Sequence, residues 1–318
     1  MMFEGRLGGE LFCQVGYDWA DQGYWNINDL PTTKIQYLDP KSCVLGKDRQ
    51  ALYFDSSEEI FQKRISLEGF KNTKFDIILC TLQNHQEAFK QLRDHYQPQA
   101  KLIRLCGNTG EQIDYSLFDG FIDTTGLYNC PENIPHVTIN QEFPMAPFFW
   151  EEPKKHKTIK NYMNCLREAK AFPVWQFLQR EMPEFEFRMH GSNGDDGGVV
   201  GLFKLGASMR DMSFLFQIKH HGEGFGHVIH NAYASGRPAI AVYEFYAGKL
   251  ASKFLINDYS AILLDDLNPQ QAIEKIKYWS EPERHLTMCK NAYKLFKDYV
   301  SFDEDEIKFR HFLEQVML

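Results

Sequence analysis

The chain has 318 residues, of which 43% are hydrophobic and 25% are charged, and its formal net charge is −8. This length and composition predict an ordinary globular protein with two domains of about 150 residues each. The acidic balance argues against a protein that coats nucleic acid, since phosphate backbones are bound mostly through concentrated lysine and arginine, although a local basic groove is compatible with it.

Cysteine usage and hydropathy suggest a compartment. The seven cysteines are scattered and form no CxxC pair, which is typical of reduced core residues. No stretch approaches the roughly 18 apolar residues of a membrane span, and the first residues lack the basic start and apolar core of a secretion signal. We therefore expect a cytoplasmic location without stable membrane insertion.

The first half of the chain alternates apolar runs with polar stretches. Because a doubly wound parallel sheet is built from such βαβ repeats, this rhythm predicts an α/β domain over residues 1–150. A helix is expected at 84–96, and the apolar runs predict strands at 11–16, 34–38, 51–54, 75–81, 101–106, 120–123 and 136–140.

A second α/β series follows a segment at 143–157 that combines three prolines with a charge run and is predicted to be a linker. The second domain is expected over 151–300, and an amphipathic helix over 303–317 within a C-terminal segment, 301–318, that could cross back to the first domain. Its expected elements are a first strand after 158, a helix at 172–181, strands at 185–191, 214–218, 238–243 and 261–264, a helix at 227–235, and helices over 269–299 that are interrupted near Pro282.

The stretch from 214 to 243 reads as strand, glycine-rich turn, helix and strand. Apolar pairs four residues apart in the helix would face the sheet, whereas His227 and Asn231 share a face that looks toward the turn. In a βαβ unit this turn and the N-terminus of the helix lie at the carboxyl edge of the sheet. Unpaired N–H groups and the helix dipole there favour an anion such as a diphosphate.

This stretch resembles the C-terminal signature of GT-B glycosyltransferases, especially the retaining enzymes of family 4. The residues that carry the resemblance are Glu223-Gly224-Phe225-Gly226 and Ala234-Ser235-Gly236-Arg237-Pro238-Ala239-Ile240. The resemblance implies two Rossmann-like domains facing a central cleft. It also implies that Glu223 contacts the transferred sugar and that Asn231, at the position of a second family glutamate, meets the ribose. An amide can still donate to and accept from a diol.

The resemblance implies a nucleoside diphosphate sugar as the donor, with a UDP-sugar favoured. The donor-binding residues are then expected to be His221, Gly222, Gly224, Phe225, Gly226, His227 and Asn231. A cation at the end of the preceding strand would offset the charge that develops on the leaving diphosphate, and Lys219 occupies that position. Arg167 and Lys170, after the first strand of the second half, partly match a family pair that clamps the diphosphate.

Acceptor-side candidates come from the first half. His85 follows the strand at 75–81, where it could orient the acceptor or act as a base, and Asn108 follows the strand at 101–106. Sugars stack on aromatic faces and bond to carboxylates, which adds Asp18, Trp19 and Tyr24 after the strand at 11–16. No required cofactor is expected.

Metal chemistry has two candidate motifs. Four histidines lie between 220 and 230, but no cysteine or carboxylate at zinc spacing accompanies them, and imidazoles also serve as neutral donors to phosphate or sugar. The acidic run at 303–306 has Asp-x-Asp spacing but opens the last helix, where acidic residues favour the dipole. We therefore predict no metal site.

The sequence favours a retaining, metal-independent glycosyltransferase that transfers a hexosyl or pentosyl group to an unidentified acceptor. Glycans, lipids, small molecules and a hydroxylated base in DNA all remain open as acceptors. Two alternatives stay beside it: a GT-B-fold nucleotide-sugar 2-epimerase, which would convert donor without an acceptor, and a non-catalytic nucleotide- or sugar-binding module.

Overall fold

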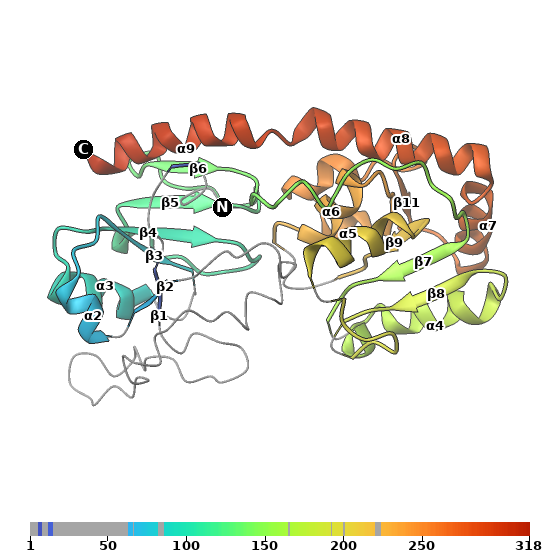
Figure 1. The fold of residues 1–318 in the computed structure, drawn as a ribbon, viewed down its shortest axis with the longest axis horizontal. Coiled ribbons are helices and arrows are strands. Elements are labelled where there is room, and N and C mark those ends of the chain that lie inside the picture. Colours follow the sequence, from blue (N-terminus) through green and yellow to red (C-terminus); the bar gives the residue numbers. More distant parts are fainter. Residues whose placement is uncertain are drawn as a thin grey trace. The chain divides into compact units, whose positions relative to one another are not determined.

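The computed structural model describes residues 6–7, 12–14, 63–65, 67–81, 86–164, 166–191, 193–199, 201–219 and 224–318. The chain divides into two compact units (Figure 1). Unit 1 comprises Met1–Glu142 together with Phe302–Leu318, and unit 2 comprises Phe143–Ser301. The chain therefore passes between the units twice, after Glu142 and after Ser301.

Unit 1 contains a parallel four-stranded sheet in the order β3-β4-β5-β6. Its strands are β3 (Ile77–Cys80), β4 (Lys101–Cys106), β5 (Gly120–Asp123) and β6 (His136–Thr138), with helix α3 (Gln86–Tyr96) between the first two. A separate parallel pair joins β1 (Phe12–Gln14) to β2 (Lys63–Ile65), followed by α2 (Leu67–Asn72), and a 3-10 turn, η5 (Tyr115–Leu117), precedes β5. The strands predicted at 34–38 and 51–54 lie outside the described residues.

The sheet of unit 1 is covered by a helix from the far end of the described chain. Helix α9 (Phe302–Met317) buries Phe309, Phe312 and Val316 in one apolar cluster with Ile122 of β5 (Figure 1). Its close approach requires a glycine, since a Cβ on Gly120 would lie 2.7 Å from Val316 Cγ2. The opposite cluster of the unit contains residues of β3, β4 and α2 together with Leu92 of α3.

Unit 2 contains a second parallel sheet, in the order β11-β10-β9-β7-β8. Its elements are β7 (Thr158–Asn161), η6 (Leu166–Glu168), α4 (Phe172–Glu181), β8 (Glu186–Met189), α5 (Leu202–Arg210), β9 (Phe214–Phe216), α6 (His227–Ala234), β10 (Ala239–Ala241), η7 (Tyr243–Phe245), η8 (Leu250–Phe254), β11 (Ala261–Leu263), α7 (Pro269–Trp279) and α8 (Pro282–Tyr299). The three central strands are buried along their whole length, as expected for a parallel sheet with helices on both faces.

The segment at 143–157, predicted as a linker, packs closely on unit 2. Phe143 and Phe148 are buried and their rings meet edge to face at 5.6 Å. Two glycines of unit 2 leave the space that this segment occupies. A Cβ on Gly206 would lie 2.1 Å from the Pro147 carbonyl oxygen, and a Cβ on Gly236 would lie 2.4 Å from the Trp150 ring. The proline-rich run is thus part of the second core.

Gly236 gives a direct test of this packing. Its φ is +69°, and an added methyl group would strike the Trp150 ring. Overpacking costs about 1–3 kcal/mol, and a left-handed backbone adds about 1–2 kcal/mol for a residue with a Cβ. We expect Gly236→Ala to lower the free energy of unfolding in urea by a sum within these ranges. Gly198→Ala, where no atom lies within 4 Å, is the matched control and should change it little.

Within the part of the chain that the structure describes, none of the helices combines the length and the apolar character that crossing a bilayer requires.

Candidate functional site

The glycine-rich turn ends where α6 begins, on the carboxyl side of β9. Gly226 precedes the helix with φ +78° and ψ +50°, a left-handed conformation that suits glycine, and as the N-cap residue it has no side chain to cap the first turn of α6. Gly224 and Phe225 are buried beneath this turn. The predicted strand and helix are therefore present as β9 and α6, and the N-cap residue leaves the N-terminal N–H groups of α6 without a side-chain cap of its own.

The sheet order places the start of α6 at a topological switch point. From β7 the chain first moves outward to β8, and it then returns to the other side of β7 to form β9. In open parallel sheets ligands bind outside the carboxyl ends of the strands at the point where the order reverses. That point lies between β7 and β9, and α6 starts beside it.

Asn161 fixes the backbone at this switch point. Its side-chain amide donates to the Phe216 carbonyl oxygen at 2.8 Å, and its Oδ1 accepts from the Met163 N–H at 2.9 Å. One buried side chain therefore joins the ends of β7 and β9 and starts the loop after β7.

His230 supports the turn through a ring contact and a hydrogen bond. Its ring stacks on Phe225 with centroids 3.8 Å apart, and Nδ1 lies 3.0 Å from the Gly226 carbonyl oxygen, so Nδ1 carries the proton and donates. Complete burial lowers the pKa of His230 to about 3, which keeps the imidazole neutral. His230 is a structural support of the turn. His227 opens the helix, and although the residue as a whole is exposed, its ring meets the Phe225 ring edge to face at 4.9 Å and burial lowers its pKa to about 4.

Asn231 lies one helical turn after His227. The residue is 6% exposed, and its buried Oδ1 has no hydrogen-bond partner among the described residues. A buried amide oxygen without a partner costs free energy unless a ligand or water supplies a donor. This position is where the sequence predicts a contact with ribose.

The predicted cations lie on loops at the same edge of the sheet. The Arg167 Nε donates to the Asn193 carbonyl oxygen at 3.0 Å, and its guanidinium pairs with Asp195 and covers the Phe172 ring. Arg167 thereby fastens the loop after β7 to the loop after β8. Lys170 is exposed on the same loop, and Lys219 is half-buried three residues after β9.

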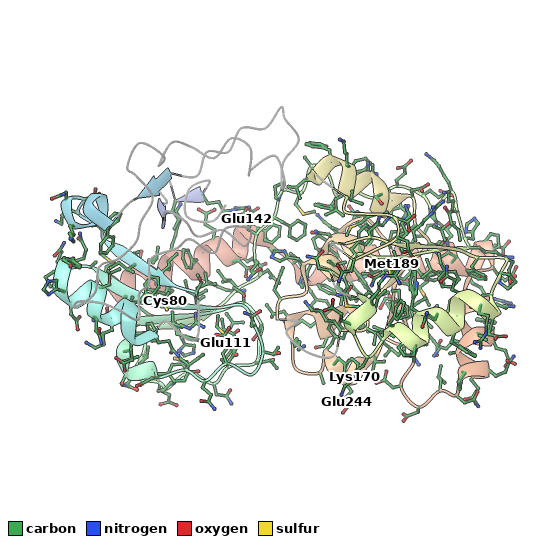
Figure 2. All side chains as sticks on the ribbon, turned by 90° about the horizontal axis from the view of Figure 1, so that it is seen from below. Cys80, Glu111, Glu142, Lys170, Met189 and Glu244 are labelled. Carbon is green, nitrogen blue, oxygen red and sulfur yellow. The ribbon has the colours of Figure 1, made fainter. Side chains whose placement is uncertain are left out.

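Sequence reasoning missed an acidic residue at this edge. Glu244 follows β10 in η7, and the backbone N–H groups of Tyr243 and Glu244 donate to the Asp265 carboxylate at 2.8 and 3.2 Å. Figure 2 shows Glu244 and Lys170 on the same side of unit 2. Only the position of Glu244 directly after a predicted strand could have pointed to it.

Two further groups occupy the β8 end of the edge. Tyr162 and His190 stack with centroids 5.1 Å apart, and the Tyr162 hydroxyl lies 2.8 Å from Ser208 Oγ in α5. The His190 Nδ1 lies 3.3 Å from the Gly197 carbonyl oxygen, and burial lowers the pKa of His190. These contacts tie the loop after β8 to the sheet and to α5.

In unit 1, the loop after β4 presents Asn108 on a braced backbone. The Tyr128 hydroxyl donates to the Asn108 carbonyl oxygen at 2.8 Å and accepts from the Glu111 N–H at 3.0 Å. Glu111, which is labelled in Figure 2, forms an ion pair with the fully buried Arg104. Burial raises the pKa of the adjacent Cys106 thiol to about 12, so this cysteine is protonated at neutral pH and is a poor nucleophile.

Several predicted site residues cannot be placed, because they lie outside the described residues. They are Asp18, Trp19, Tyr24, His85, His221, Gly222 and Glu223. Among the residues that are described, no three histidine, cysteine, aspartate or glutamate side chains are arranged to hold a metal ion.

No protein-family model matches this sequence, and no curated protein matches it either. Solved structures do share its fold. HepE from Anabaena, solved with UDP and glucose, is 12% identical, with a TM-score of 0.59 over 76% of this chain and 78% of HepE. TarM is 11% identical, with a TM-score of 0.61 over 79% of this chain and 57% of TarM. An alpha-glucosyltransferase, AGT, solved with UDP, is 10% identical, with a TM-score of 0.58 over 85% and 88% of the two chains.

The chain has the GT-B fold. The predicted fold class is thereby confirmed, with one parallel α/β sheet in each unit.

Proposed function

We propose that the chain is a glycosyltransferase that transfers a sugar from a UDP-sugar to an acceptor hydroxyl. The observation that carries the proposal is the start of α6 at the switch point of unit 2, where the helix N-terminus follows a left-handed glycine that has no capping side chain, and a buried Asn231 Oδ1 lacks a partner among the described residues. Two structures with the same fold, HepE and AGT, were solved with UDP.

We assign residues to the diphosphate, the ribose and the transferred sugar of the donor. The N–H groups from Gly224 to His227 would face the diphosphate, Asn231 would accept from a ribose hydroxyl, and Glu223 would hold the transferred sugar. Phe225 supports the turn by its contact with His230. His221 and Gly222, in the same turn, would complete the donor site.

The reaction breaks the bond between the sugar's anomeric carbon and the β-phosphate oxygen, and the electron pair stays on UDP. Lys219 and Lys170, with the dipole of α6, would stabilise this charge without a metal ion. Arg167 would join them by exchanging its exposed pair with Asp195 for phosphate oxygens. The new bond forms from the acceptor oxygen, whose proton passes to a base; His85 is our candidate.

Asn108 is assigned to the acceptor side, because the loop that carries it is rigidly braced in unit 1. Asp18, Trp19 and Tyr24 are assigned there with it. The acceptor class is a glycan, a lipid, a small molecule or a hydroxylated DNA base, and we propose that the sugar is transferred with retention of configuration.

The assignment is tested by transfer and donor hydrolysis over a panel of UDP-, GDP-, ADP- and CDP-sugars. We expect turnover with a UDP-sugar, and we expect Glu223→Ala to reduce it by about 100-fold or more, as for loss of a contact that strengthens in the transition state. Glu283→Ala, at an exposed position in α8, is the matched control and should keep full activity. Equal turnover by wild type and Glu223→Ala would remove the assignment of Glu223.

Asn231 favours one second candidate function, a non-catalytic nucleotide-binding module, because an amide stands where the family has a carboxylate. Such a module would bind UDP and turn over no donor in the panel. For the enzyme we expect Asn231→Ala to raise the KM for the UDP-sugar by about tenfold, the effect of losing one or two hydrogen bonds, with a smaller change in kcat.

A further inference from the structure

The two passages of the chain between the units are fastened to each other inside unit 1. Arg6 Nε contacts Glu142 Oε1 at 2.5 Å, and Glu142 is the last residue before the first passage. The same guanidinium contacts Asp303 at 2.7 Å and Glu306 at 3.0 Å, directly after the second passage. One arginine thus links the chain leaving unit 1 to the chain that re-enters it.

A second link runs beside the first. The buried carboxylate of Asp305 accepts from the Asn140 backbone N–H at 3.1 Å and from the Asn140 side-chain amide at 2.8 Å. Because Asp305 is 2% exposed, these bonds are shielded from water and hold better than surface pairs. Near the two passages, Arg6 and Asp305 therefore join the two chain segments of unit 1 by separate sets of contacts.

Inside unit 2, Phe143 makes the corresponding link. It is the first residue after the first passage, it is buried, and its ring lies 6.1 Å from the ring of Phe296 near the end of α8, which leads into the second passage. Its ring also lies 6.5 Å from that of His227, edge to face. His227 is the first residue of α6, and its ring meets Phe225 of the turn at 4.9 Å.

We infer that Phe143 is a positioning residue that couples donor binding at the start of α6 to a hinge formed by the two passages. The neighbouring residues Glu142 and Phe143 connect the Arg6 link of unit 1 with the donor turn of unit 2. A diphosphate bound at the first turn of α6 restricts the His227 ring, and through Phe143 it stiffens both passages. All the contacts used here lie within one unit or the other. The inference rests on the proposed donor site.

Amide hydrogen exchange with and without UDP tests the coupling. In wild type we expect UDP to slow exchange about fivefold or more at the hinge amides, which we define as residues 140–143 and 300–306. Phe143→Leu keeps an apolar side chain but loses the ring contacts, so UDP should still bind within about threefold of wild-type affinity while the slowing at the hinge amides disappears. Thermal melting confirms that the variant is folded.

Arg6→Gln examines the unit 1 side independently of the Phe143 site. We expect faster exchange at the hinge amides without UDP, and unchanged UDP affinity. The matched control is Arg180→Gln, which breaks an exposed ion pair on α4 and should leave hinge exchange unchanged.

The outcomes separate the coupling from the proposed function. The coupling is overturned if UDP still slows exchange at the hinge amides of Phe143→Leu. It is also overturned if the wild-type protein binds UDP and exchange at these amides does not change. Neither result contradicts the proposed donor site. Wild type that binds no UDP overturns the proposed function, and the coupling falls with it.

Discussion

Replacing Arg237 with methionine is expected to destabilise unit 2 strongly. The guanidinium is 1% exposed. Its Nε and Nη2 donate to the Arg210 carbonyl oxygen at 3.1 and 2.7 Å, and its Nη1 donates to those of Glu151 and Ser235, each at 3.0 Å. Arg210 ends α5 and Ser235 follows α6, so the cation lies at the negative ends of two helix dipoles.

Methionine matches much of the volume of Arg237 but leaves at least two buried carbonyl groups without donors. Each such loss costs about 1–3 kcal/mol, so we expect the free energy of unfolding to fall by about 3 kcal/mol or more. For a domain of this size that corresponds to roughly 6–12 °C in Tm. Arg237→Lys should recover part of the loss, since lysine restores the charge but not the fork of donors.

Urea unfolding followed by circular dichroism measures this effect. Arg188→Met is the control, because Arg188 pairs with Glu186 and Asp196 on an exposed surface, where solvent screening leaves ion pairs with little effect on stability. An Arg237→Met protein as stable as Arg188→Met would contradict the structural role of Arg237.

Unit 2 is also expected to lose stability in mild acid, because of two buried histidines. The His285 Nε2 lies 2.9 Å from the Ser213 carbonyl oxygen, so it carries the proton, and the bare Nδ1 accepts from Nδ1 of His156 at 2.9 Å. Burial lowers the pKa of His285 to about 4, and complete burial lowers the pKa of His230 to about 3. Both rings are neutral in the native protein at neutral pH.

The direction of the pH effect follows from proton uptake. In the unfolded chain these histidines titrate near 6.5, so below that pH these two groups bind up to two more protons in the unfolded state than in the native state. Burial also lowers the native pKa of His190 and that of His227, to about 4, and both shifts act in the same direction. Their contribution to stability is complete above pH 6.5 and is lost as the pH falls toward 4. As an order of magnitude, each histidine lowers the free energy of unfolding by about 1.4 kcal/mol per pH unit in this range.

Urea midpoints between pH 4 and pH 8 test this expectation. His285→Gln removes one titrating group and should reduce the slope below pH 6 by about 1.4 kcal/mol per pH unit. His311→Gln, at an exposed position on α9, should leave the slope unchanged. Stability that stays flat from pH 7 to pH 4.5 would show that neither ring is held neutral by the fold.

Local patterns predicted the elements that short-range physics controls. The apolar runs at 101–106 and 120–123 match β4 and β5 residue for residue, and the helix predicted at 172–181 matches α4. Helix α5 was missed, because it follows a glycine-rich loop and contains a glycine and a serine, which are weak helix formers. Its position depends on Gly206 meeting the Pro147 carbonyl oxygen, a contact between distant residues that no spacing shows.

The candidate site likewise has one part that the local sequence predicts and another that depends on contacts between distant residues. The turn before α6 could be predicted because strand, glycines and helix are consecutive in the chain, and Gly226 adopts the left-handed conformation such a turn needs. The pairing of Arg167 with Asp195 and the contact of Phe143 with His227 join residues 28 and more positions apart. They depend on the order of the strands in the sheet, which the local patterns of a single sequence do not specify.

The return of α9 to unit 1 has a consequence for the order of folding during synthesis. The apolar cluster formed by Ile103, Ile122 and Val137 is completed by Phe309, Phe312 and Val316, which the ribosome adds after the whole of unit 2. Unit 2 therefore has all its residues available first, although multidomain chains commonly fold from the N-terminus. Until α9 emerges, one apolar face of the first sheet lacks its cover, and during that interval a nascent unit 1 would be most exposed to aggregation or to capture by a chaperone.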